Sequence, residues 1–188
     1  MSCALVYMAA GNSRRFGSNK LLYLLDGKPL YRHLLERLCA ISCENVSYTL
    51  FFVTRYEQLL AETAGLPLTP VFAPQARLGA SHTVRAALFA AAGFDCFAFF
   101  AADQPYLAAD TVRDFLSAAE NSGKGLACVR SAGIPGNPAW FSNKYRDELL
   151  ALTGDTGGRA VLRAHPDDLF LFDVPDAREL MDIDVPPV

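Results

Sequence analysis

Continuous apolar runs alternate with segments of helical periodicity along the whole chain. The apolar runs have strand length, and we expect buried strands at residues 3–9, 48–54, 69–72, 96–102, 126–130, 139–141 and 169–172. The periodic segments predict helices at residues 29–40, 56–64, 81–92, 108–121, 143–152 and 158–165. Strands that are apolar on both faces need a layer of helices on each side. The pattern therefore predicts an α/β fold, a three-layer α/β/α sandwich around a mainly parallel sheet.

The spacing of these elements predicts a single domain over residues 1–188. The length suffices for one sizeable core, and the sequence has no internal repeat and no low-complexity linker. In parallel sheets, ligands bind beyond the carboxyl ends of the strands. We therefore expect the functional residues in the turns that follow Ala9, Ala73 and Ala102.

Composition and charge narrow the classes of partner. Apolar residues make up 52% of the chain, and the net charge is −3 with no basic stripe, so a nucleic-acid partner is not expected. No apolar run approaches the ~18 to 20 residues of a membrane span. The short N-terminal run lacks the basic region of a signal peptide, and five cysteines without a CxxC pair indicate reduced thiols. We expect a cytoplasmic protein with a small anionic ligand.

The first predicted strand ends in a glycine-rich basic turn, AAGNSRRFGSNK, which contains no acidic residue. Gly11 and Gly17 allow the backbone to turn sharply and to approach a ligand closely. Successive N–H groups, the Ser13 hydroxyl and the charges of Arg15 and Lys20 suit phosphate binding. The turn matches neither GxxxxGK[ST] nor GxGxxG. A solvated basic loop is the alternative, but a position after the first strand of an α/β sheet favours phosphate.

Asp103 stands directly after a buried strand, in the segment FFAADQPYL. A carboxylate at the edge of a sheet is costly unless it has a cation or hydrogen bonds. Mg²⁺ is a suitable partner because it binds a few carboxylates together with substrate phosphates. Capping of the next helix is the alternative, but that helix is expected to begin several residues later.

A helix N-terminus is expected in the segment APQARLGASHTVRAAL. Gly79 would let the chain pass close to a base or ribose. Ser81 suits an N-cap and Thr83 the first turn, at a helix end that favours anions. An ordinary capped helix explains these residues equally well.

The opening turn resembles the LAAGxSxRxGxxK signature of MobA-like nucleotidyltransferases, and among them most closely that of molybdenum cofactor cytidylyltransferases. Further segments between Ala4 and Pro186 resemble the family's motifs in the family's order. The resemblance implies a Rossmann-like nucleotidyltransferase fold and Mg²⁺-dependent catalysis by Arg15, Lys20 and Asp103. It assigns nucleotide binding to Ala9, Ala10, Gly11, Ser13, Arg15, Lys20, Gly79, Ser81 and Thr83.

The resemblance also implies an acceptor site made of Gln104, Asn137, Asp155 and Arg159. Asn137, in GIPGNPAWF, stands where the family often has His, and for neighbouring Gly136 we expect a hairpin turn. In LTGDTGGRAVL, Asp155 is expected to cap the helix that Gly158 and Arg159 open. Arg159 near that helix N-terminus opposes the helix dipole. Its partner is then either an acceptor phosphate or Asp155, and the two have equal weight.

The C-terminal segment LMDIDVP resembles the family's DIDTPED ending, which implies a second metal ligand there. We expect Asp182 and Asp184 to point to opposite sides of an extended segment, so that only one joins Asp103. The resemblance selects Asp182. The expected metal site is Mg²⁺ held by Asp103 and Asp182.

The resemblance implies transfer of CMP from CTP to the phosphate of molybdenum-bound molybdopterin, with release of pyrophosphate. Guanylyltransferase relatives tend to have Gly where this chain has Ala10, and a methyl group there narrows the space for a purine. We therefore expect CTP as the nucleotide and a molybdoenzyme as the receiver of the product. The alternatives are a guanylyl or other nucleotidyl transfer to a different phosphate, or a non-catalytic molybdenum cofactor carrier. A carrier would need the anion-binding turn but not two metal-binding carboxylates.

Overall fold

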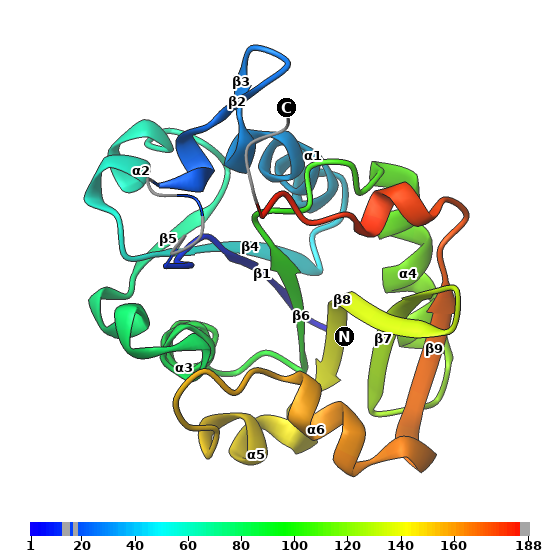
Figure 1. The fold of residues 1–188 in the computed structure, drawn as a ribbon. Coiled ribbons are helices and arrows are strands. Elements are labelled where there is room, and N and C mark those ends of the chain that lie inside the picture. The colour runs from blue at the N-terminus through cyan, green and yellow to red at the C-terminus, as the bar shows by residue number, and fades with distance from the viewer. Residues whose placement is uncertain (13–15, 17–18, 185–188) are drawn as a thin grey trace.

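The computed structural model describes residues 1–12, 16 and 19–184. Their longer strands are β1 (Cys3–Met8), β4 (Tyr48–Thr54), β5 (Thr69–Phe72), β6 (Cys96–Ala101), β7 (Leu126–Ser131), β8 (Ile134–Ser142) and β9 (Leu169–Asp173). They form one sheet in the order β5-β4-β1-β6-β8-β7-β9 (Figure 1). All neighbours pair in parallel except β8, which runs antiparallel to β6 and β7. Short strands β2 (Leu24–Leu25) and β3 (Lys28–Pro29) pair with each other.

Helices cover both faces of this sheet. The α-helices are α1 (Leu30–Glu44), α2 (Glu57–Glu62), α3 (Ala80–Ala90), α4 (Ala109–Asn121), α5 (Arg146–Leu150) and α6 (Arg159–Ala164). Short 3₁₀ helices lie at Lys20–Leu22, Pro74–Leu78, Asn143–Tyr145, Pro166–Asp168 and Ala177–Leu180. Helices α1, α2 and α4 pack on one face, and α3, α5 and α6 pack on the other (Figure 1).

The central strand β1 shows why two helical layers form. Its side chains alternate between the faces of the sheet. Cys3, Leu5 and Tyr7 pack in the core under α1 and α4, whereas Ala4 and Val6 pack in the core under α3. All five side chains are completely buried. The predicted α/β/α sandwich with a mainly parallel sheet is therefore confirmed.

The β7–β8 hairpin differs from the prediction. Strand β8 begins at Ile134, five residues before the expected start, and Ile134 pairs with Ser131. The turn lies at Ala132 and Gly133, where the φ angles are 48° and 80°. Gly136 lies inside β8, so the hairpin turn expected there was wrong. The turn lies where two consecutive residues have positive φ angles, and not where Gly and Pro residues are most frequent in the sequence.

The carboxyl ends of the parallel strands β4, β1 and β6 share one edge of the sheet. The segments that follow Ala9 and Ala102 begin there, as expected, and so does the turn after β5 that leads into α3. Among the described residues, no helix is long and apolar enough to cross a membrane.

Candidate functional site

Lys20 lies between two carboxylates at this edge of the sheet. Its Nζ donates to Asp103 Oδ2 at 2.7 Å and to Asp184 Oδ1 at 3.0 Å, and the residue is only 9% exposed. Burial by itself lowers the pKa of Lys20, but the hydrogen bonds and charges of Asp103 and Asp184 outweigh it and raise the pKa above the ordinary value. We call Lys20, Asp103 and Asp184 the charged cluster.

The segment that carries Asp103 is held by backbone and side-chain hydrogen bonds. The Asp103 carbonyl accepts from the N–H of Ile183 at 2.9 Å, which ties the C-terminal segment to the end of β6. Arg37 on α1 donates to the carbonyls of Pro105 and Leu107 at 2.6 and 2.8 Å. The turn after β6 is thus fixed on both sides, and Asp103 does not cap α4, whose N-cap position is Ala108.

Asp182 and Asp184 both belong to the neighbourhood of Asp103. Ile183 between them is buried, while both acids are exposed on the other side of the chain. Desolvation, with the negative charge of Asp103 next in weight, raises the pKa of Asp182, and Asp184 adds to the rise. The expectation of opposite sides was wrong, because side chains two residues apart on extended backbone point the same way.

Glu179 anchors this C-terminal segment, and the sequence reasoning missed it. The residue is 8% exposed, and its two carboxylate oxygens accept from the Ala108 N–H at 2.9 Å and the Thr111 hydroxyl at 3.0 Å. The carboxylate thereby satisfies N–H and O–H donors at the start of α4. No local signal identifies the partner, since the residues are about seventy positions apart in the sequence.

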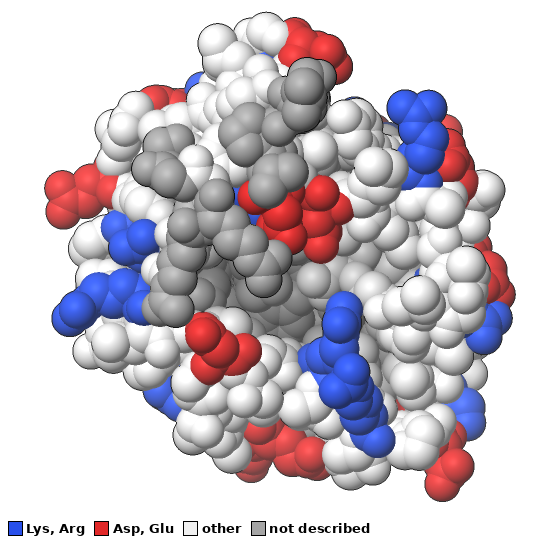
Figure 2. Space-filling view, viewed as in Figure 1, with Lys and Arg blue, Asp and Glu red and all other residues white. Residues whose placement is uncertain are grey.

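The acids fit a divalent metal ion of the hard, oxygen-binding kind. Asp103, together with Asp182 or Asp184, supplies the one or two carboxylates that Mg²⁺ uses in nucleotide sites. The described residues contain no group of three acids, cysteines or histidines placed to enclose a metal. Substrate phosphates and water would complete the coordination. In Figure 2, acidic side chains gather near the centre of this face, and basic side chains lie across from them over α6.

A first cavity of about 230 Å³ lies beside the charged cluster. It is lined by Met8, Ala10, Gly11, Asn12, Ala76, Gly79, Ala80, Thr83, Ala101, Asp103 and Asp155. A Cβ atom on Gly11 would meet no atom of the described residues within 4 Å, so among these residues the backbone is open to a ligand. Tyr56 steadies the turn, since its hydroxyl donates to the Gly11 carbonyl at 2.7 Å. Tyr56 is a second residue that sequence reasoning missed.

Among the described residues that were predicted to bind the nucleotide, Ala9, Lys20 and Ser81 do not line this cavity. Ala9 is completely buried, its N–H donates to Val53 O, and its carbonyl accepts from the Thr54 hydroxyl, each at 2.8 Å. Its backbone groups are therefore already used. Ser13 and Arg15, with neighbouring Gly17, lie outside the described residues.

Gly79 and Ser81 serve contacts within the protein. Gly79 is the N-cap of α3 with a φ of 135°, and a Cβ atom there would overlap the Gly154 backbone and lie 2.8 Å from Asp155 N. Ser81 is fully buried, and its hydroxyl donates to Gly154 O at 2.8 Å. The expected Ser81 N-cap was wrong, because this hydroxyl binds a distant loop. Gly79 and Thr83, which is 6% exposed, both line the first cavity, whereas Ser81 does not.

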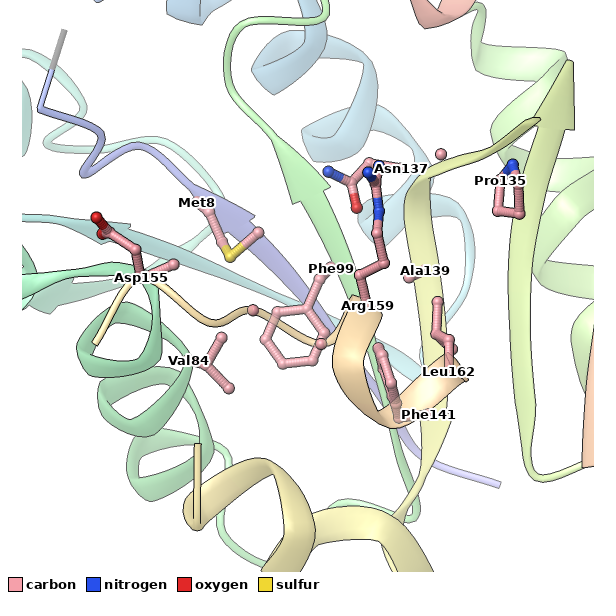
Figure 3. Close-up of a pocket in the computed structure, with 14 residues that line it drawn as sticks. Met8, Val84, Phe99, Pro135, Asn137, Ala139, Phe141, Asp155, Arg159 and Leu162 are labelled. Carbon is pink, nitrogen blue, oxygen red and sulfur yellow. The ribbon is translucent and has the colours of Figure 1, made fainter. Parts of the chain in front are cut away.

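A second cavity, also of about 230 Å³, adjoins the first along Met8, Ala80 and Asp155. Arg159 reaches from α6 toward Asn137 on β8, while Asp155 lies on the other side of the cavity beside α3 (Figure 3). Arg159 makes no ion pair with any described residue, so the Arg159–Asp155 alternative is not what the structure adopts. Asp155 does not cap α6 either: the N-cap is Gly158, without a side-chain hydrogen bond.

A third, larger cavity of about 350 Å³ connects Arg159 to the acids. Its polar lining includes Gln104, Asn137, Arg159 and Asp182. Gln104 is 4% exposed and donates to Leu180 O at 3.4 Å, but its Oε1 has no hydrogen-bond partner among the described residues. A buried amide oxygen without a partner is unusual in a folded protein. Three of the four predicted acceptor residues thus meet here, and Asp155 stands apart, between the first and second cavities.

Comparison with known proteins places this geometry in a family. Residues 5–169 match the MobA-like NTP transferase domain. Purine catabolism protein PucB of Bacillus subtilis is 29% identical over 193 residues, which cover 96% of this chain and 91% of that protein. A probable molybdenum cofactor guanylyltransferase of Pyrococcus horikoshii is 26% identical over 144 residues, covering 77% of this chain and 65% of that protein.

Solved structures share the fold. A nucleotidyl transferase from Methanothermobacter, Mth528, superimposes with a TM-score of 0.78 at 22% identity, covering 98% of this chain and 92% of that one. Rv0371C of Mycobacterium tuberculosis, in a complex with manganese, has a TM-score of 0.72 at 21% identity over 93% of this chain and 89% of that one. With the family match spanning most of its length, the chain belongs to the MobA-like NTP transferases and is a nucleotidyltransferase.

Proposed function

We propose that this protein transfers CMP from CTP to the terminal phosphate of molybdenum-bound molybdopterin and releases pyrophosphate. One observation supports a reaction between two bound ligands: the consecutive residues Asp103 and Gln104 line different cavities. Asp103 borders the first cavity and Gln104 the third. A nucleotide in the first cavity and a phosphate acceptor in the third would therefore meet at the end of β6.

The chemistry asks for alignment and charge neutralisation. An oxygen of the acceptor phosphate attacks the α-phosphorus of the nucleotide, and the bond to pyrophosphate breaks. No general base is required, because the acceptor phosphate is already ionised. Lys20, with Arg15, would hold the triphosphate and stabilise the leaving pyrophosphate. Bound Mg²⁺ would supply further charge neutralisation at the α-phosphate and acceptor oxygens, held by Asp103 with Asp182 or Asp184.

The acceptor side would position the attacking phosphate. Arg159 makes no ion pair with a described residue, and it lines the same cavity as Asn137 and Gln104. A guanidinium binds a phosphate through paired, charge-assisted hydrogen bonds. Orientation of this kind contributes to rate by bringing the reacting atoms together.

The preference for CTP rests on Ala10. Ala10 lines the first cavity, and its methyl group would narrow the space available there to a base or ribose. The Pyrococcus relative is named a probable guanylyltransferase, which makes GTP the second candidate nucleotide. A carrier without catalytic activity is the third possibility, but a carrier would have no use for the carboxylates of Asp103 and Asp184 beside Lys20.

Release of pyrophosphate from each of the four NTPs, with and without purified molybdenum cofactor, tests this function. We expect release from CTP, only with the cofactor and a divalent metal present. Preference for GTP would replace the cytidylyl assignment by a guanylyl one. Release with a different phosphate acceptor alone would reject the molybdopterin assignment, and binding of cofactor without any release would support a carrier.

A further inference from the structure

The contacts of Lys20 place its ammonium at a position suited to a metal ion. Nζ lies 2.7 Å from Asp103 Oδ2 and 3.0 Å from Asp184 Oδ1. A divalent cation that used these same two oxygen atoms would have to lie between them, where the ammonium now lies. Mg²⁺ binds such oxygens at about 2.0–2.1 Å, so the ion and the ammonium cannot share the position.

Electrostatics makes the two cations alternatives. At about 4 Å, like charges repel by several kcal/mol at a partly buried site. The Lys20 side chain is 11% exposed and that of Asp103 is 25% exposed, so water screens this region only in part. The ammonium already neutralises one of the two negative charges that a metal ion would use.

We propose that Lys20 competes with the divalent metal for Asp103 and Asp184, and that the nucleotide decides the competition. The inference rests on the proposed metal role of Asp103. Phosphate oxygens draw the Lys20 ammonium away from the carboxylates and bring the metal ion with them. The metal therefore binds as part of a metal–nucleotide complex, and the protein alone binds it weakly.

This exchange requires a thermodynamic coupling. If the nucleotide removes a competitor of the metal, it tightens metal binding, and by linkage the metal tightens nucleotide binding by the same factor. Substitution of Lys20 by an uncharged residue removes the competitor permanently. The variant should then bind metal well without nucleotide, and the nucleotide should tighten metal binding less.

Binding of Mn²⁺ to the purified protein without nucleotide, followed by the loss of the free-ion electron paramagnetic resonance signal, tests the proposal. We expect Lys20→Met to bind Mn²⁺ at least about tenfold more tightly than the wild type. Lys28→Met is the matched control, because Lys28 is also paired with a carboxylate, that of Glu36, but on an exposed surface. It removes the same charge and should leave Mn²⁺ affinity unchanged. Equal or weaker Mn²⁺ binding by Lys20→Met would overturn the proposal, and so would equal gains in both variants.

If Lys20→Met does not fold, Lys20→Gln takes its place, and thermal unfolding shows whether this variant is folded. The Mn²⁺ affinity is then measured with and without CTP, or with whichever NTP the protein binds. The nucleotide should tighten Mn²⁺ binding in the wild type at least about threefold more than in the variant. An equal effect in both proteins would reject the exchange. Neither experiment involves turnover or an acceptor. The result of this test therefore does not depend on whether the proposed transfer reaction is correct.

Discussion

The charged cluster and the acceptor side of the site use their polar groups in opposite ways. In the cluster, each group has a partner: Lys20 bonds Asp103 and Asp184 at 2.7 and 3.0 Å. On the acceptor side, Arg159 has no ion pair and Gln104 Oε1 no hydrogen bond among the described residues. A polar group with satisfied partners serves structure and binding together, whereas one without a partner keeps its bonding capacity for a ligand. Substitutions in the two regions should therefore have different signatures.

The largest effect is expected in the charged cluster. Asp103→Ala should lower kcat/KM about a thousandfold, because it removes the carboxylate closest to the proposed reaction. The fold should persist, since Lys20 retains Asp184. The measurements are the turnover rate with Mg²⁺ and the midpoint of thermal unfolding. The control variant is Asp110→Ala, which removes an aspartate whose side chain is 94% exposed and is paired with Arg113. Turnover near that of the wild type would show that the metal assignment is wrong.

The close contact between Gly79 and the Gly154 backbone gives the next largest effect. Gly79→Ala should destabilise the protein by about 3 kcal/mol, because the new methyl group overlaps the Gly154 backbone at a φ that disfavours side chains. Gly11→Ala is the matched control, since its Cβ would meet no atom of the described part of the chain within 4 Å. Urea unfolding compares the two variants. Equal stability would mean that the loop at Gly154 moves away from Gly79 at no cost in free energy.

On the acceptor side we expect a change in binding without a change in stability. Arg159→Met should raise KM for the acceptor by about ten- to a hundredfold, equivalent to the loss of a charged hydrogen bond of about 1.5–3 kcal/mol. KM for the nucleotide and the free energy of unfolding should not change. Arg163→Met, four residues later on α6, is the control. Equal losses for nucleotide and acceptor would place Arg159 in both subsites and remove the contrast between the two regions.

The smallest effect concerns the base. Ala10→Gly should raise kcat/KM with GTP relative to CTP by about tenfold, because one methyl group of space is worth about 1–3 kcal/mol. Both nucleotides are compared in both proteins at fixed Mg²⁺ and saturating acceptor. An unchanged ratio would remove Ala10 as the cause of the preference. The region around Thr83, which lines the same cavity, would then be the next place to search.

Much of the arrangement of strands and helices could be predicted, because it depends on the local pattern of apolar and polar residues. Strands at Tyr48–Thr54 and Thr69–Phe72 have the predicted bounds, since runs of apolar residues between turn signals need no distant partner to be recognised. The position of Asp103 after β6 followed for the same reason. The expected cap by Ser81 was wrong because propensity at a helix start does not reveal a competing acceptor such as Gly154 O.

The sequence by itself determined the α/β layers, the family and the residues that carry charge at the edge of the sheet. Tertiary structure decided which of those charges meet. Lys20 is 83 residues from Asp103 and 164 from Asp184, and only the parallel order of β1 and β6, with the bond from Ile183 to Asp103, brings them together. It also decided that Gln104, Asn137 and Arg159 share a cavity. Hydrophobic periodicity is a local property, but an ion pair or a cavity is made by segments that the fold alone makes neighbours.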